Sequence, residues 1–112
     1  MKIINVNETK IIETPHKVDV RKIYDYNNAQ AMHITLQSGE TLKPHITPVD
    51  VFFYILEGAV DVRVGDETIT VEKDNLVESP KNIVHCLSNS STSKARILVV
   101  KSPKTAAQTK LL

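Results

Sequence analysis

Polar and apolar residues alternate in twos along most of this chain, a pattern typical of strands that bury one face. The alternation is clearest in residues 60–64, Val-Asp-Val-Arg-Val, and in residues 68–72, Thr-Ile-Thr-Val-Glu. Gly65 and the two acidic residues after it lie between these runs. Because glycine accepts the positive φ angle of a tight turn, we expect an antiparallel hairpin here and a mostly β chain.

Similar patterns predict further strands on both sides of this hairpin. The expected ranges are 17–24, 31–36, 83–87 and 95–101, with the turn-favouring pair Asn27-Asn28 between the first two. We expect eight to ten short strands in all, and a short helix or a frayed end over residues 105–112. A chain of 112 residues is long enough for one hydrophobic core, so it is predicted to be a single domain over residues 1–112.

Residues 51–56 and 97–100 are apolar at consecutive positions, so both faces of these strands would be apolar. Exposing an apolar strand face to water is unfavourable, so another part of the protein or a partner must cover the second face. The chain's own N-terminal strand or C-terminal tail could do so. We favour a homodimer interface instead.

Charge and composition narrow the classes of partner. Fourteen lysines and arginines against thirteen acidic residues leave no one-signed field to attract nucleic acid or anionic lipid. Polar residues near the start do not resemble an export signal, and no apolar run reaches the roughly 18 residues that span a bilayer, so a cytoplasmic protein without membrane contact is expected. Cys86 is the single cysteine, which excludes an intrachain disulfide and a cysteine-based metal cluster.

Two segments carry recognisable motifs. The first segment, residues 39–58, reads Gly-Glu-Thr-Leu-Lys-Pro-His-Ile-Thr-Pro-Val-Asp-Val-Phe-Phe-Tyr-Ile-Leu-Glu-Gly. In the second segment, residues 74–89, the motif positions are occupied by Asp74, Pro80, Asn82, His85 and Asn89. Together they resemble the two motifs of the cupin superfamily, with Thr47 at the place of the second histidine of the first motif and Val51 at the place of its glutamate. Asp74 and Asn82 replace glycines of the second motif, and both residue types accept a left-handed turn conformation.

This resemblance implies a double-stranded β-helix, or jelly-roll barrel, with core motifs at 39–58 and 74–89 and a tail at 102–112. In metal-binding cupins, two histidines and the glutamate of the first motif hold one divalent ion together with the histidine of the second. Only His45 and His85 remain here. Binding of Mn, Fe, Ni or Zn would need Asp50 or His33 to complete the site, so weak affinity is expected.

The leading interpretation is a small-molecule-binding pocket around His45 and His85. The residues expected to line it are Thr47, Val51, Phe53 and Ile55. One alternative is a metal-dependent isomerase or oxygenase completed by Asp50 or His33. Another is a metal-free epimerase in which a neutral histidine acts as the base, as in some similar cupin sugar epimerases. A non-catalytic ligand-sensing module, or two idle buried histidines, are the remaining interpretations, and the substrate is not predicted.

Overall fold

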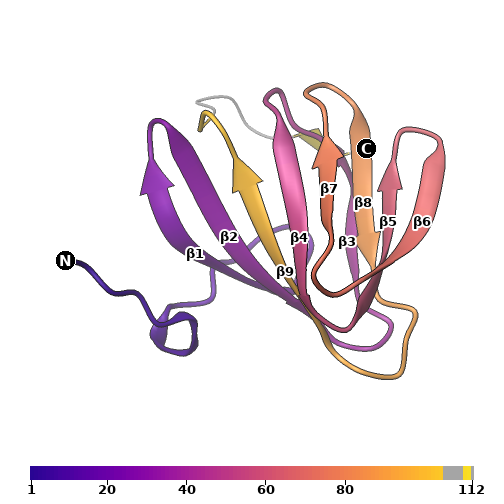
Figure 1. Cartoon of the computed structure of the whole chain (residues 1–112), viewed down its shortest axis with the longest axis horizontal. Coiled ribbons are helices and arrows are strands. Elements are labelled where there is room, and N and C mark those ends of the chain that lie inside the picture. Colours follow the sequence, from indigo (N-terminus) through magenta and orange to yellow (C-terminus); the bar gives the residue numbers. More distant parts are fainter. Residues whose placement is uncertain (105–109, 112) are drawn as a thin grey trace.

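A computed structural model describes residues 1–104 and 110–111, which form two five-stranded antiparallel sheets (Figure 1). In spatial order, the first sheet contains β1 (Asp19–Tyr26), β2 (Ala29–Leu36), β9 (Ala95–Lys101), β4 (Val51–Glu57) and β7 (Leu76–Ser79). The second contains β10 (Lys110–Leu111), β3 (Thr41–Ile46), β8 (Val84–Ser88), β5 (Ala59–Val64) and β6 (Glu67–Glu72). This double-stranded β-helix confirms the predicted all-β jelly-roll class.

The strands lie close to their predicted positions. The β5–β6 hairpin turns at Gly65, and β9 has the predicted bounds. The first strand begins two residues late because Lys17 has a φ of 57°, a turn conformation. Of the predicted C-terminal helix or frayed end, residues 105–109 and 112 lie outside the described residues, while residues 110–111 pair with β3 as a strand. For those two residues the prediction was wrong.

The core lies between the two sheets and follows the alternation in the sequence. On β4, for example, Val51, Phe53 and Ile55 are buried, whereas the residues between them are only partly covered. The central strand β9 repeats this pattern beside it, with Ile97 and Val99 buried. The inner faces of these two strands therefore join the core, and their apolar outer faces form part of the surface of the first sheet.

Left-handed turns stand where the motifs predict them. Gly58 has a φ of 77°, and a Cβ atom there would lie 2.7 Å from the carbonyl oxygen of Lys94, so only glycine fits. Asp74 and Asn82, which replace glycines of the second motif, have φ angles of 69° and 64°. The two substitutions therefore keep the turns that the motif requires.

The N-terminal segment lies on the β1 side of the molecule, where the indigo trace extends away from the sheets (Figure 1). It holds a short 3₁₀ turn, η1 (Val6–Glu8), whose Val6 carbonyl accepts a hydrogen bond from Arg21 Nη1 at 2.9 Å. Closer to β1, the Ile12 amide donates to the Val20 carbonyl. Within the described residues, no helix has the length and apolar character needed to cross a membrane.

Candidate functional site

Neighbouring strands bring His45 and His85 together inside the barrel. The two residues face each other across the β3–β8 pair, and their Nε2 atoms are 2.9 Å apart. Both side chains are buried, with 7% and 2% of their surface exposed. The two histidines that the motifs single out therefore form one contact pair.

A bulge in β3 supplies the hydrogen bonds that orient this pair. The β3–β8 register shifts between Leu42 and His45, and the intervening Pro44 has no amide hydrogen for the ladder. The backbone of Lys43 is thereby available to side chains. Its amide donates to His16 Nδ1 at 2.8 Å, and its carbonyl accepts from His45 Nδ1 at 2.6 Å. One residue of the backbone thus holds two imidazole rings.

These contacts determine the tautomers of the neutral pair. His45 carries its hydrogen on Nδ1, so its Nε2 accepts, and His85 Nε2 must donate to it. His85 Nδ1 is then the acceptor for the Ser79 hydroxyl at 2.8 Å. Thr47 Oγ1 lies 3.3 Å from His85 Nε2, at the point where the two rings meet. All four ring nitrogens have partners, as buried polar atoms should.

Burial favours the uncharged form of each ring in this group. It lowers the pKa of His85 to about 3, with smaller effects from His45 and Lys101. Burial also lowers the pKa of His45, although the hydrogen bond to the Lys43 backbone opposes this. The pKa of His16 falls to about 4, again mainly through burial, then through the nearby His45 and Lys43. At pH 7 all three imidazoles are therefore neutral.

A cavity of about 210 Å³ adjoins this group and opens between β1, β2, β3, β9 and residues 12–16. Its lining residues are Ile12, Thr14, Pro15, His16, Val20, Met32, Ile34, Leu42, His45, Val99 and Lys101. The lining is mostly apolar, with a few polar groups, as in small-molecule sites. Its volume is below the ~300 Å³ at which pockets for drug-sized ligands begin, so it suits a small ligand.

The residues expected to line the pocket lie deeper in the barrel. Thr47 contacts His85 beneath the cavity, and the Phe53 ring packs edge-on against His85 with ring centres 5.2 Å apart. Val51 and Ile55 belong to the buried core. None of these four borders the open cavity, and all four are buried.

Asp50 and His33, the candidates to complete a metal site, do not join the pair. Asp50 is exposed, and its Oδ1 accepts a hydrogen bond from the Lys81 amide at 2.9 Å. His33 lies on the opposite face of β2 from Met32 and Ile34, which line the cavity, and it contacts Arg96. Among the described residues, no three His, Cys, Asp or Glu side chains could hold a metal ion together. The donors present thus fall short of the three ligands that a tightly held divalent ion needs.

Three residues of the site were not identified from the sequence. His16 lies in a loop outside both motifs, yet its ring centre is 5.0 Å from that of His45. Lys101 ends β9 and lines the cavity. Ser79 ends β7 beside Pro80, and its place next to the second motif is the one signal that sequence reasoning could have used.

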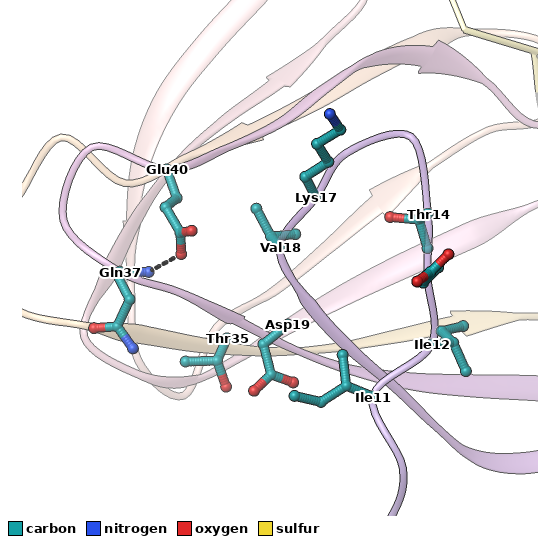
Figure 2. Close-up of a pocket in the computed structure, with 10 residues that line it drawn as sticks. Ile11, Ile12, Thr14, Lys17, Val18, Asp19, Thr35, Gln37 and Glu40 are labelled. Carbon is teal, nitrogen blue, oxygen red and sulfur yellow. Dashed lines mark hydrogen bonds between the residues drawn. The ribbon is translucent and has the colours of Figure 1, made fainter.

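A wider hollow of about 610 Å³ is lined by residues of the 11–19 segment and by Thr35, Gln37 and Glu40 (Figure 2). Glu13, Asp19, Glu40 and Lys17 contribute its charged groups, and Glu40 Oε1 accepts a hydrogen bond from the Gln37 amide. None of the predicted site residues borders it. The larger volume therefore does not mark the chemically distinctive site, which is the smaller cavity at the histidines.

Comparison with known proteins agrees with the barrel and the motif pair. The model of the family described as "Cupin domain" matches residues 32–101. The tetracenomycin polyketide synthase protein TcmJ of Streptomyces glaucescens is 32% identical over 72 residues, which are 63% of this chain and 48% of TcmJ. The match thus spans about half the length of that relative.

Solved structures show the same architecture. The protein TT1209 from Thermus thermophilus superposes with a TM-score of 0.81 and 27% identity, covering 94% of this chain and all of that one. The polyketide cyclase RemF from Streptomyces resistomycificus gives a TM-score of 0.85 at 19% identity, covering all of this chain and 85% of RemF. At such low identity, RemF supports the fold alone.

Proposed function

This chain belongs to the cupin family, and on that premise we propose that it binds a small molecule in the cavity beside His16 and His45. The observation that carries the proposal is a buried, fully hydrogen-bonded imidazole pair of which one ring, His45, lines an apolar cavity. An apolar lining contributes affinity, and a few placed polar groups orient the ligand.

The lining indicates what such a molecule is like. Met32, Ile34, Leu42 and Val99 favour an apolar body, and the neutral imidazoles and Lys101 favour a polar group at one end. The similarity to TcmJ, which is named as a polyketide synthase protein, supports an organic ligand that combines carbon rings or chains with oxygen atoms. The cavity volume of about 210 Å³ limits its size.

Binding is tested by titrating the protein with small aromatic and aliphatic alcohols, 4-ethylphenol first, and recording methyl NMR spectra. The methyl signals of Met32, Ile34, Leu42 and Val99 should shift together and saturate. The variant M32W should abolish the response because the indole fills the cavity, whereas L76W, on an exposed edge strand, should keep it. Shifts confined to surface residues for every probe would overturn the proposal.

Metal-free proton transfer is a second candidate function. It is favoured by the tautomer of His45, whose Nε2 keeps its lone pair at neutral pH because Nδ1–H is bound to the Lys43 carbonyl. A substrate would have to replace His85 as the partner of that nitrogen. Deuterium exchange at the α-carbon of 4-ethylcyclohexanone in D₂O measures this activity. Exchange that H45F abolishes would support a base, and binding without exchange would indicate a ligand-sensing role.

The chain is also proposed to form a homodimer through the outer face of the first sheet. Leu98, Tyr54 and Leu76 are cross-strand neighbours on this face, and Val100 and Phe52 form the next row. Leu76 is 49% exposed, and a hollow of about 500 Å³ borders Phe52, Leu76 and Val100. These side chains form a contiguous apolar patch, unlike a single exposed apolar residue, and a second copy of the chain would cover it.

A further inference from the structure

In the described part of the chain, the ionisable groups that line the cavity are all bases. They are His16 on the loop before β1, His45 on β3 and Lys101 at the end of β9. Among the described residues, no aspartate or glutamate borders this cavity. Among the described residues, a ligand in this space therefore meets groups that donate hydrogen bonds or carry positive charge, and no carboxylate.

His16 is held as a hydrogen-bond donor by the backbone. Its Nδ1 accepts from the Lys43 amide, which can only donate. The ring hydrogen of neutral His16 must therefore be on Nε2. No atom of residues 1–104 accepts a hydrogen bond from this Nε2–H group. The ring thus offers one donor for which the described protein supplies no acceptor.

The neighbouring ring cannot replace His16 in this role. His45 uses Nδ1–H on the Lys43 carbonyl and Nε2 on His85. His85 does not line the cavity, and both of its ring nitrogens are engaged within the barrel. A ligand that leaves the imidazole pair intact can gain a ring hydrogen bond at the cavity only from His16.

We infer that the cavity selects a small organic monoanion with an apolar body, and that His16 Nε2–H donates to its anionic oxygen. The inference rests on the proposed binding function and adds the charge class of the ligand. A carboxylate, phenolate or enolate accepts stronger hydrogen bonds than a neutral group does, and Lys101 at the same wall favours the same sign. The apolar lining accommodates the uncharged remainder of the molecule.

A nearly isosteric pair of probes tests this selection. The dissociation constants of 4-ethylbenzoate and 4-ethylbenzamide are measured at pH 7.5 by NMR titration, following the methyl signals of Met32 and Val99. The benzoate should bind about fivefold more tightly, the difference between a charged and a neutral hydrogen-bond acceptor. Equal affinities, or tighter binding of the amide, would overturn the inference and leave the proposed function standing. Failure of both probes and of the alcohols to shift the cavity methyls would instead refute the proposed function.

Variants at position 16 test the assigned donor. H16F removes the donor but keeps a ring, so it should bring the benzoate affinity close to that of the amide, while H16Q should restore part of the preference through its amide hydrogens. H16A replaces H16F if the latter does not give a folded amide spectrum. A benzoate preference unchanged in the variants without a donor would show that His16 does not hold the anion.

Discussion

Two buried histidines on opposite faces of the barrel wall have different surroundings. His85, on β8, points into the barrel and is 2% exposed. His33, on β2, points away from the cavity-lining residues of that strand and is 5% exposed. His85 has partners at both ring nitrogens, namely Ser79 and His45. His33 Nε2 accepts from Arg96 Nε at 3.1 Å, and its buried Nδ1 has no partner in the described part of the chain.

The charges near the two rings differ as well. His33 has Arg96, Asp19 and Arg21 around it, and its pKa is lowered by burial and then by Arg96. His85 faces another imidazole, two hydroxyl groups and the Phe53 ring. Burial alone therefore does not determine which hydrogen-bond partners and charges surround a histidine. The face of the strand decides which groups surround each ring, and a shift of one residue in either strand would turn its histidine to the other face.

The largest effect expected from this difference is on metal affinity. Thr47 contacts His85, and Val51 starts β4 on its buried face, so T47H combined with V51E would add two ligands beside His45 and His85. We expect weak binding of Mn, Fe, Ni or Zn by the wild type and binding at least about 100-fold tighter by the double variant, because neutral imidazoles and an anionic carboxylate complete the set. Calorimetric titration at pH 7.5 measures this.

The outer face supplies a matched control for the metal experiment. The control variant combines T35H with L98E and so places the same residue types around His33. Thr35 lies on the same face of β2 as His33, and Leu98 is the cross-strand neighbour of His33 on β9. These positions lie on one sheet without a facing histidine, and Arg96 is close by, so little gain is expected. Tight binding by the wild type would mean that residues other than Thr47 and Val51 complete the site.

A smaller effect is expected from pH on stability. His85 has a pKa of about 3 in the folded protein but an ordinary value near 6.5 when unfolded. Below pH 6.5 the unfolded chain binds a proton that the folded chain does not, so stability is full above pH 6.5 and is lost as the pH falls toward 3. At pH 5 the loss from His85 is about 2 kcal/mol. Urea unfolding at pH 7 and 5 measures it.

Substitutions assign this pH dependence to one ring. H85Q cannot take up a proton at this position, so the difference in unfolding free energy between pH 7 and 5 should shrink. H33Q should remove a smaller part of it, because opposing charges from Asp19 partly offset the effects of burial and Arg96 on His33. An undiminished difference in H85Q would contradict the low pKa of His85.

The smallest effect concerns self-association through the outer face. We expect a homodimer at micromolar concentration, and F52K should weaken its association at least about tenfold by placing a charge in an apolar interface. T68K, on the exposed edge strand β6 of the other sheet, should leave association unchanged. Sedimentation velocity measures both, and a wild-type monomer at this concentration would contradict the proposal.

Much of the fold could be predicted because it depends on short-range rules. Alternation in twos identified β5 and β6, and glycine chemistry identified the turn at Gly65. Asp74 and Asn82 adopt the left-handed turns expected of them, since few other residue types accept that conformation. The histidines that meet across β3 and β8 were selected by the resemblance to the two cupin motifs.

The β class, the turns and the identity of the central histidine pair could therefore be read from the residues along the chain. The packing of the folded chain, by contrast, places His16 against His45, which lies 29 positions later in the chain, and at the wall of the cavity. It also decided that His33 and Asp50 stay outside and that the Phe53 ring occupies the space behind His85. These outcomes depend on the bulge in β3, on the position of the N-terminal loop and on how side chains from distant strands fill the barrel. None of these features leaves a periodic pattern along the chain, so they could not be predicted from it.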